Sequence, residues 1–178
     1  MSIKKLIILS TLLAFSFYCK PNAKSQLQYW ENNAKAYTEA VNTYPNFKVL
    51  LEAKMKEATA IWTEAEKLTD EEAKASKMKE ANDKLEDLLG QFTQIKSKTE
   101  GLLSSINKLD AKKLDKKKDA VRDDAVDSAE KTIAEIKQKL QSATPANEEE
   151  AKTITKDVIS SLISAQGVVD RAAKAVKK

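Results

Sequence analysis

Residues 70–109 have the sequence DEEAKASKMKEANDKLEDLLGQFTQIKSKTEGLLSSINKL, and this stretch decides the fold class. Its apolar residues follow one another at alternating steps of three and four, which places them along one side of an α-helix. With one threonine, they are Met78, Ala81, Leu85, Leu88, Phe92, Ile95, Thr99, Leu102, Ile106 and Leu109. A helix of this length would be about 60 Å long. Gly90 and Gly101 lie inside it without a neighbouring proline, so we predict a continuous helix that is locally soft at the glycines.

The signals for helix ends divide the rest of the chain. Thr69, followed by Glu72, predicts a capping box before the long helix, and Asn147 predicts an N-cap after the break at residues 142–147. Pro45 removes a backbone donor and interrupts the first apolar stripe, so the helix either kinks there or restarts with Pro45 in its first turn. Residues 107–119 contain few apolar side chains, so we predict a turn or bend there.

The same spacing of three and four continues over the other segments, and no alternating pattern predicts a strand. We therefore predict an all-α fold: an elongated antiparallel bundle of three to four long helices, the first of them kinked near Pro45. It would form a single domain over residues 26–178. The predicted core of these segments consists of Leu27, Trp30, Ala34, Tyr37, Val41, Tyr44, Phe47, Leu51, Met55, Ala58, Trp62, Ala65, Leu68, Val121, Ala125, Ala129, Thr132, Ile136, Leu140, Ala143, Ala151, Ile154, Val158, Ser161, Ala165, Val168, Ala172 and Val176.

The composition argues against several classes of function. The chain of 178 residues has no histidine, which is the commonest general base and metal ligand, and a single cysteine. Its three glycines are far apart, so they form no phosphate-binding loop. The net charge of +4 is too small for a dedicated nucleic-acid-binding protein. We expect a protein that is not an enzyme, has no cofactor or metal site, and binds no nucleic acid.

The first nineteen residues, MSIKKLIILSTLLAFSFYC, have the pattern of an export signal. Lys4 and Lys5 precede an apolar run of thirteen residues over positions 6–18. This run is too short for a membrane-spanning helix, which needs about 20 residues. The chain turns polar directly after Cys19, and Pro21 favours extended backbone before it. We predict a signal peptide over residues 1–18 and a short tether over residues 19–25.

With Cys19 at the end of the apolar run, this leader resembles that of a bacterial lipoprotein precursor. The resemblance implies a lipoprotein-type signal peptide, with Cys19 lipidated through a diacylglycerol thioether at the mature N-terminus. The sequence departs from the family pattern at Tyr18, where the family prefers a small residue, and at Ser16, where it prefers an aliphatic one.

The body, rich in Lys, Glu and Ala, resembles spirochaetal surface lipoproteins in composition. This resemblance implies a lipid-anchored protein of the cell envelope, in the outer membrane or on the cell surface rather than in the inner membrane. It implies a non-catalytic, adhesin-like function, with a host matrix or serum component as the partner.

The leader also allows other interpretations. An ordinary signal peptidase would cleave after Ala14-Phe15-Ser16 or after Ala23-Lys24-Ser25, and an uncleaved anchor or a buried apolar helix is a third alternative. The functional alternative is a periplasmic helical scaffold or chaperone-like binder, lipidated or released by such cleavage. A small enzyme that uses carboxylates alone is a further alternative, which no residue pattern favours.

Three groups of residues are candidates for binding. Tyr29 lies off the predicted stripe and is therefore the aromatic side chain most expected at the surface. Lys177 and Lys178 would present a terminal lysine of the kind that host kringle modules recognise. A cluster suited to an acidic polysaccharide or an anionic membrane consists of Lys112, Lys113, Lys116, Lys117 and Lys118. Each group has a simple structural alternative, a solvated helix surface or a frayed helix end. None of the three groups predicts an oligomeric state.

Overall fold

The computed structural model describes residues 22–112 and 114–177, and this part of the chain is entirely helical apart from short connections. The predicted leader, Cys19, Lys113 and Lys178 lie outside the described residues. Five α-helices and one short 3₁₀ turn follow one another without a strand between residues 22 and 177, which confirms the all-α fold class. They are α2 (Ala23–Thr43), η1 (Pro45–Phe47), α3 (Lys48–Glu66), α4 (Glu71–Asp110), α5 (Lys116–Ser142) and α6 (Glu148–Ala175).

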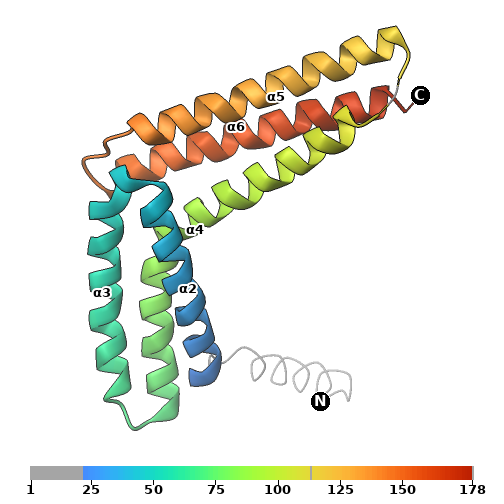
Figure 1. The fold of residues 1–178 in the computed structure, drawn as a ribbon. Helices are drawn as coiled ribbons and strands as arrows, with labels where there is room; N and C mark the ends of the chain where they lie inside the picture. The colour runs from blue at the N-terminus through green and yellow to red at the C-terminus, as the bar shows by residue number, and fades with distance from the viewer. Residues whose placement is uncertain (1–21, 113, 178) are drawn as a thin grey trace, which may run out of the picture.

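The helices form two arms that meet at an angle (Figure 1). The lower arm consists of α2, α3 and the N-terminal half of α4, and the upper arm consists of the C-terminal half of α4 with α5 and α6. We call their junction the elbow. The 40-residue helix α4 belongs to both arms, so the bundle is bent rather than straight.

Helix α4 has the predicted register. Every position of the stripe quoted above is buried except Thr99, which is half-buried. Asn82 and Leu89 are buried as well, because neighbouring helices contact α4 from more than one side. The helix is continuous through Gly90 at its midpoint, as predicted. A Cβ atom added at Gly90 would meet no atom within 4 Å, so the glycine contributes a soft backbone rather than room for a close approach.

The prediction of a first helix kinked near Pro45 is wrong. Helix α2 ends at Thr43, and after the turn Pro45–Phe47 the chain runs back as the separate helix α3. Tyr44, the residue before the proline, has φ −127° and ψ 67°, because the proline ring excludes it from the helical region. Phe47 is fully buried and packs edge-on against Phe92 of α4, with ring centroids 5.1 Å apart. This contact holds the turn against α4.

The start of α2 also differs from the prediction. The helix begins at Ala23, with Asn22 as N-cap, so the last residues of the predicted tether form its first turn. Leu27, a predicted core residue, is 46% exposed, and Gln26 is buried in its place. The amide of Asn82 donates to the backbone oxygen and to Oε1 of Gln26, both at 3.0 Å. A hydrophobic pattern contains no information about such a buried polar pair, so it does not predict that Gln26 rather than Leu27 faces the core at the start of α2.

Smaller corrections concern the other helices. Asp70, rather than Thr69, caps α4, and its Oδ1 accepts from the N–H of Ala73 at 2.7 Å. Val121 is 42% exposed. In α6 the side chain of Leu162 is buried instead of Ser161, because the face that packs on α4 and α5 is rotated from the predicted stripe. The break at 142–147, the Asn147 cap and the turn within 107–119 are confirmed.

A network of ion pairs ties the two arms together at the elbow. Lys54 of α3 lies 2.5 Å from Glu148 of α6, and Lys152 of α6 lies 2.8 Å from Glu148 and 2.5 Å from Asp87 of α4. Burial raises the pKa of Glu148, but the hydrogen bonds from Lys152 and Lys54 outweigh burial and lower that pKa below its ordinary value of 4.5. Hydrogen bonds to Asp87 and Glu148 raise the pKa of Lys152.

Acid is therefore expected to weaken the elbow through Glu148. Because the folded pKa of Glu148 lies below the unfolded one, its contribution to the free energy of unfolding is complete above pH 4.5 and is lost as the pH falls through the folded pKa. Glu148→Gln should lower the free energy of unfolding by at most about 1 kcal/mol at about pH 7, since solvent screens the pairs, and should remove part of the loss seen on going to about pH 3. Urea unfolding at both pH values measures this.

Glu149→Gln is the matched control, because Glu149 is 88% exposed and its carboxylate lies 3.8 Å from Lys152. Equal pH profiles for the two variants would contradict the assignment of the acid-sensitive contribution to Glu148.

Candidate functional site

The structure brings two separate groups of lysines to one end of the molecule. The connection between α4 and α5 and the last turn of α6 both lie at the free end of the upper arm (Figure 1). A shallow groove lined by both Val121 and Ala175 confirms that the start of α5 is beside the end of α6. We call this end, residues 107–124 and 170–178, the distal tip. Its described lysines outside ion pairs are Lys108, Lys112, Lys116, Lys117, Lys118, Lys174 and Lys177.

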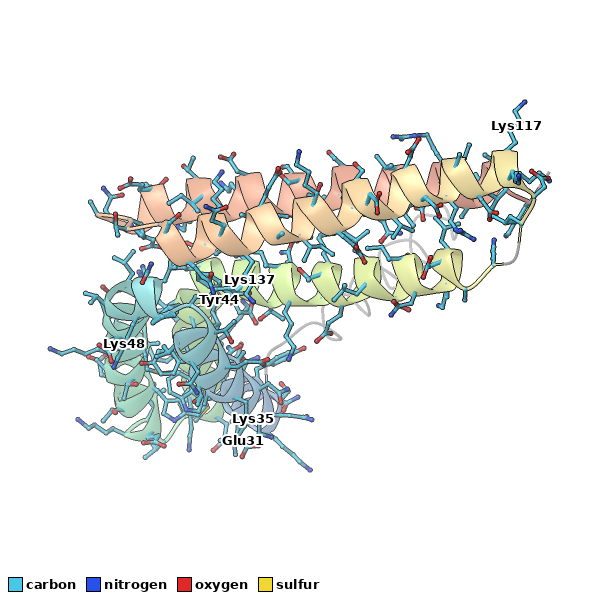
Figure 2. The ribbon with its side chains drawn as sticks, turned by 45° about the horizontal axis from the view of Figure 1, so that its top comes forward. Glu31, Lys35, Tyr44, Lys48, Lys117 and Lys137 are labelled. Atoms are coloured by element: carbon cyan, nitrogen blue, oxygen red, sulfur yellow. The ribbon has the colours of Figure 1, made fainter. Side chains whose placement is uncertain are left out.

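The start of α5 places three of these lysines in one helical turn. Asp115 is the N-cap, and its Oδ1 accepts from the N–H groups of Lys117 and Lys118 at 3.1 and 3.0 Å. Lys116 and Lys117 are exposed, and Figure 2 shows the Lys117 side chain pointing away from the end of the arm. The positive end of the helix dipole lies in the same turn, so these cations are placed where the dipole disfavours them.

Arg122 explains why the neighbouring aspartates do not neutralise the lysines. Its guanidinium lies 2.9 Å from Asp119 and 2.7 Å from Asp123, and Nη1 donates to the backbone oxygen of Lys112 at 2.8 Å. The hydrogen bond with Asp123 is the largest cause that raises the pKa of Arg122. Arg122 also lies 3.9 Å from Asp110 at the end of α4, so it holds the connection between α4 and α5 in place and forms ion pairs with three of the carboxylates of the tip.

The charge of the molecule is divided unevenly as a result. By sequence, the distal tip contains eleven Lys and Arg against six Asp and Glu, a net charge of +5. The remaining residues, 22–106 and 125–169, contain seventeen against twenty-one, a net charge of −4. The small total charge thus conceals a strongly positive end and a negative remainder, and only the positive end would attract a polyanion.

The aromatic candidate does not join this site. Tyr29 is 53% exposed, as expected, but it belongs to α2 in the lower arm. Its neighbour Trp30 stacks on Trp62 of α3, with ring centroids 4.6 Å apart, and is part of the packing between these helices. The exposed tyrosine is therefore an isolated surface residue rather than part of the lysine cluster.

The described residues offer few groups for other chemistry. Between residues 22 and 177, apart from residue 113, no group of three or more Cys, Asp or Glu side chains is placed to hold a metal ion. Within the same ranges, none of the helices is both long and apolar enough to cross a membrane. The acidic runs at residues 70–72 and 148–150 lie in the first turns of α4 and α6, where they stabilise the helix dipole.

Sequence reasoning identified the lysines but not their arrangement. It missed that Lys174 joins the cluster and that Arg122 occupies the nearby carboxylates. The spacing of Arg122 from Asp119, three residues, is a local signal that a search for helical ion pairs would have found. Comparison with protein-family models, curated proteins and solved structures found no match for this chain.

We predict that Asp115 keeps the first turn of α5 ordered. Asp115→Ala removes the N-cap and should lower the free energy of unfolding by about 1 kcal/mol. Amide hydrogen exchange at Lys117 and Lys118 should become faster, since both N–H groups lose their acceptor. The control is Asp124→Ala, which removes an exposed carboxylate more than two turns further along the same helix without removing a cap. Similar exchange rates in the two variants would argue against the capping role.

Proposed function

We propose that this chain is a lipid-anchored, non-catalytic binding protein of the bacterial envelope, which uses its distal tip to bind an acidic polysaccharide. The observation that carries the proposal is the gathering of seven lysines outside ion pairs, from two distant segments, at one end of the fold. A polymer with closely spaced sulfate or carboxylate groups would contact several of them at once. Each contact is weak alone, and several together give useful affinity.

The residue types also favour this class of partner. Lysine contributes a mobile point charge, which suits an irregular polymer, whereas arginine provides the rigid two-pronged contact used for defined phosphates or bases. The one arginine at the start of α5, Arg122, is already occupied by the fold. The net charge of −4 on the remaining residues would orient the molecule with the distal tip toward the polyanion.

The proposed anchor is compatible with this orientation. The described chain begins at the free end of the lower arm, whereas the distal tip is the far end of the upper arm (Figure 1). A lipid on Cys19 would therefore hold the molecule by one end and leave the lysines at the other. On this basis we favour a position in the outer membrane or on the cell surface, where an external polymer is accessible.

The tip predicts salt-sensitive binding to an immobilised sulfated polysaccharide such as dextran sulfate. Replacing Lys116, Lys117 and Lys118 by Gln should lower the salt concentration needed for elution. It should also reduce the slope of log affinity against log salt by about one for each lysine, as for other polyanions. The control replaces Lys35, Lys56 and Lys84, exposed lysines outside the tip, so that the total charge changes equally. Equal losses in both triple variants would show that total charge, rather than the tip, governs binding.

The anchor is tested separately in the native bacterium. Metabolic labelling with a fatty-acid analogue should label the wild-type protein and should not label Cys19→Ala, because the thioether requires the thiol. An unlabelled wild-type protein would refute lipidation. On intact cells, trypsin should cleave the exposed lysines of the tip; protection from trypsin would favour the periplasmic scaffold instead.

A further inference from the structure

A second feature, unrelated to the lysines, lies on the inner side of the elbow. A cavity of about 290 Å³ lies between α2 and α4 and is lined by residues from positions 36–44 and 92–100. Figure 1 shows these two helices meeting at the elbow. Its floor is aromatic, since the ring of Tyr44 stacks on that of Phe92 with centroids 4.9 Å apart. Ala36 and Ala40 of α2 leave the space above these rings. Compact apolar cavities with a few polar groups are the usual form of small-ligand sites.

The charged groups of the cavity leave one carboxylate over. Lys96 forms an ion pair with Glu39, which connects the two helices across the corner. Glu100, one helical turn after Lys96, also lines the cavity, and within residues 22–112 and 114–177 no cation lies within 4 Å of its carboxylate. The cavity therefore has a net charge of −1 at neutral pH.

The polar lining accepts hydrogen bonds more readily than it donates them. The hydroxyls of Thr93 and Thr99 donate to backbone oxygens of their own helix at 3.2 and 2.7 Å, so they offer the cavity only lone pairs. The Tyr44 hydroxyl has no hydrogen-bond partner in the described part of the chain. Figure 2 labels Tyr44 at the junction of the arms. Burial, and then the charge of Glu39, raise the pKa of Tyr44, so the hydroxyl stays protonated.

We propose that this corner cavity binds an amphipathic organic cation, in which an ammonium or guanidinium group is attached to a compact apolar body. The cation would donate to Glu100 and to the threonine oxygens, and the apolar body would lie against the Tyr44 ring, which covers the buried ring of Phe92. An anion would be repelled by the net negative charge of the lining, and a neutral apolar molecule would gain no electrostatic attraction from Glu100. The cation is either a free amine or the side chain of a lysine or arginine on another protein.

The test uses the chain from Asn22 onward, which keeps the N-cap of α2, labelled with ¹⁵N, and follows amide shifts during titration with 2-phenylethylammonium. Shifts should concentrate at residues 39–44 and 92–100. Glu100→Gln should weaken binding by about tenfold or more, since a charged hydrogen bond is lost, and Tyr44→Phe should weaken it less. Glu86→Gln, an exposed carboxylate of the same helix outside the cavity, should leave the affinity unchanged. The amide spectrum of each variant shows whether it remains folded.

Two further titrations complete the test. Neutral 2-phenylethanol should bind much more weakly than the ammonium compound. Nα-acetyl-lysine amide keeps the side-chain ammonium of a lysine within a protein. Tighter binding of this compound than of 2-phenylethylammonium would favour a protein side chain as the source, and weaker binding would favour a free amine. Dispersed shifts, equal binding of the alcohol, or an unchanged affinity in a folded Glu100→Gln protein would overturn the proposal. Because the lysine-tip variants leave the cavity intact, failure here would not affect the proposed polysaccharide site.

Discussion

The structure depends on the burial of one helix by two different sets of neighbours. The pairs α2–α3 and α5–α6 each join two antiparallel helices, and each pair exposes an apolar face until α4 covers it. Leu85 and Leu88 complete the lower arm and the elbow, and Leu102 and Leu109 complete the upper arm; all four are almost fully buried. Since burial contributes about 25 cal/mol for each Å² of apolar surface, neither arm has a sufficient core without its half of α4.

Polar contacts at the elbow add to the restraint on the angle between the arms that the continuous helix α4 and the shared apolar core provide. Besides the ion pairs of Lys152, Thr155 donates to Gln91 of α4, and Asn46 donates to the backbone of Gln141. Polar contacts are directional, whereas apolar burial tolerates sliding, so the two kinds of contact have different roles. One apolar core runs through both arms and the elbow, and the polar contacts of the elbow add directional restraints on the orientation of the arms. The corner cavity exists only in that orientation, because α2 and α4 enclose it jointly.

The sequence predicts the helices well and their partners poorly. The period of α4 was correct because its apolar residues leave a single choice of face. The chain reversal at Pro45 was missed, since a kink and a turn leave the same local pattern. Gln26, rather than Leu27, is buried because it accepts a hydrogen bond from Asn82. The two residues are 56 positions apart, so the local sequence pattern contains no signal for this contact. For the candidate site, local composition identified the lysines of the connection between α4 and α5. Lys174 lies at the same end of the molecule because α6 packs against α4 and α5, and no local sequence signal encodes this packing.

The distal tip is hard to explain by stability alone. The first turn of α5 contains three lysines, which oppose the helix dipole, and one acidic residue, Asp119, whereas the first turns of α4 and α6 contain two and three acidic residues. Nearby aspartates would relieve this cost if they paired with the lysines, but Arg122 occupies Asp119 and Asp123. Positive charge is therefore maintained where the fold disfavours it. A bound polyanion would remove this repulsion, so the same arrangement that weakens the free helix would strengthen the complex.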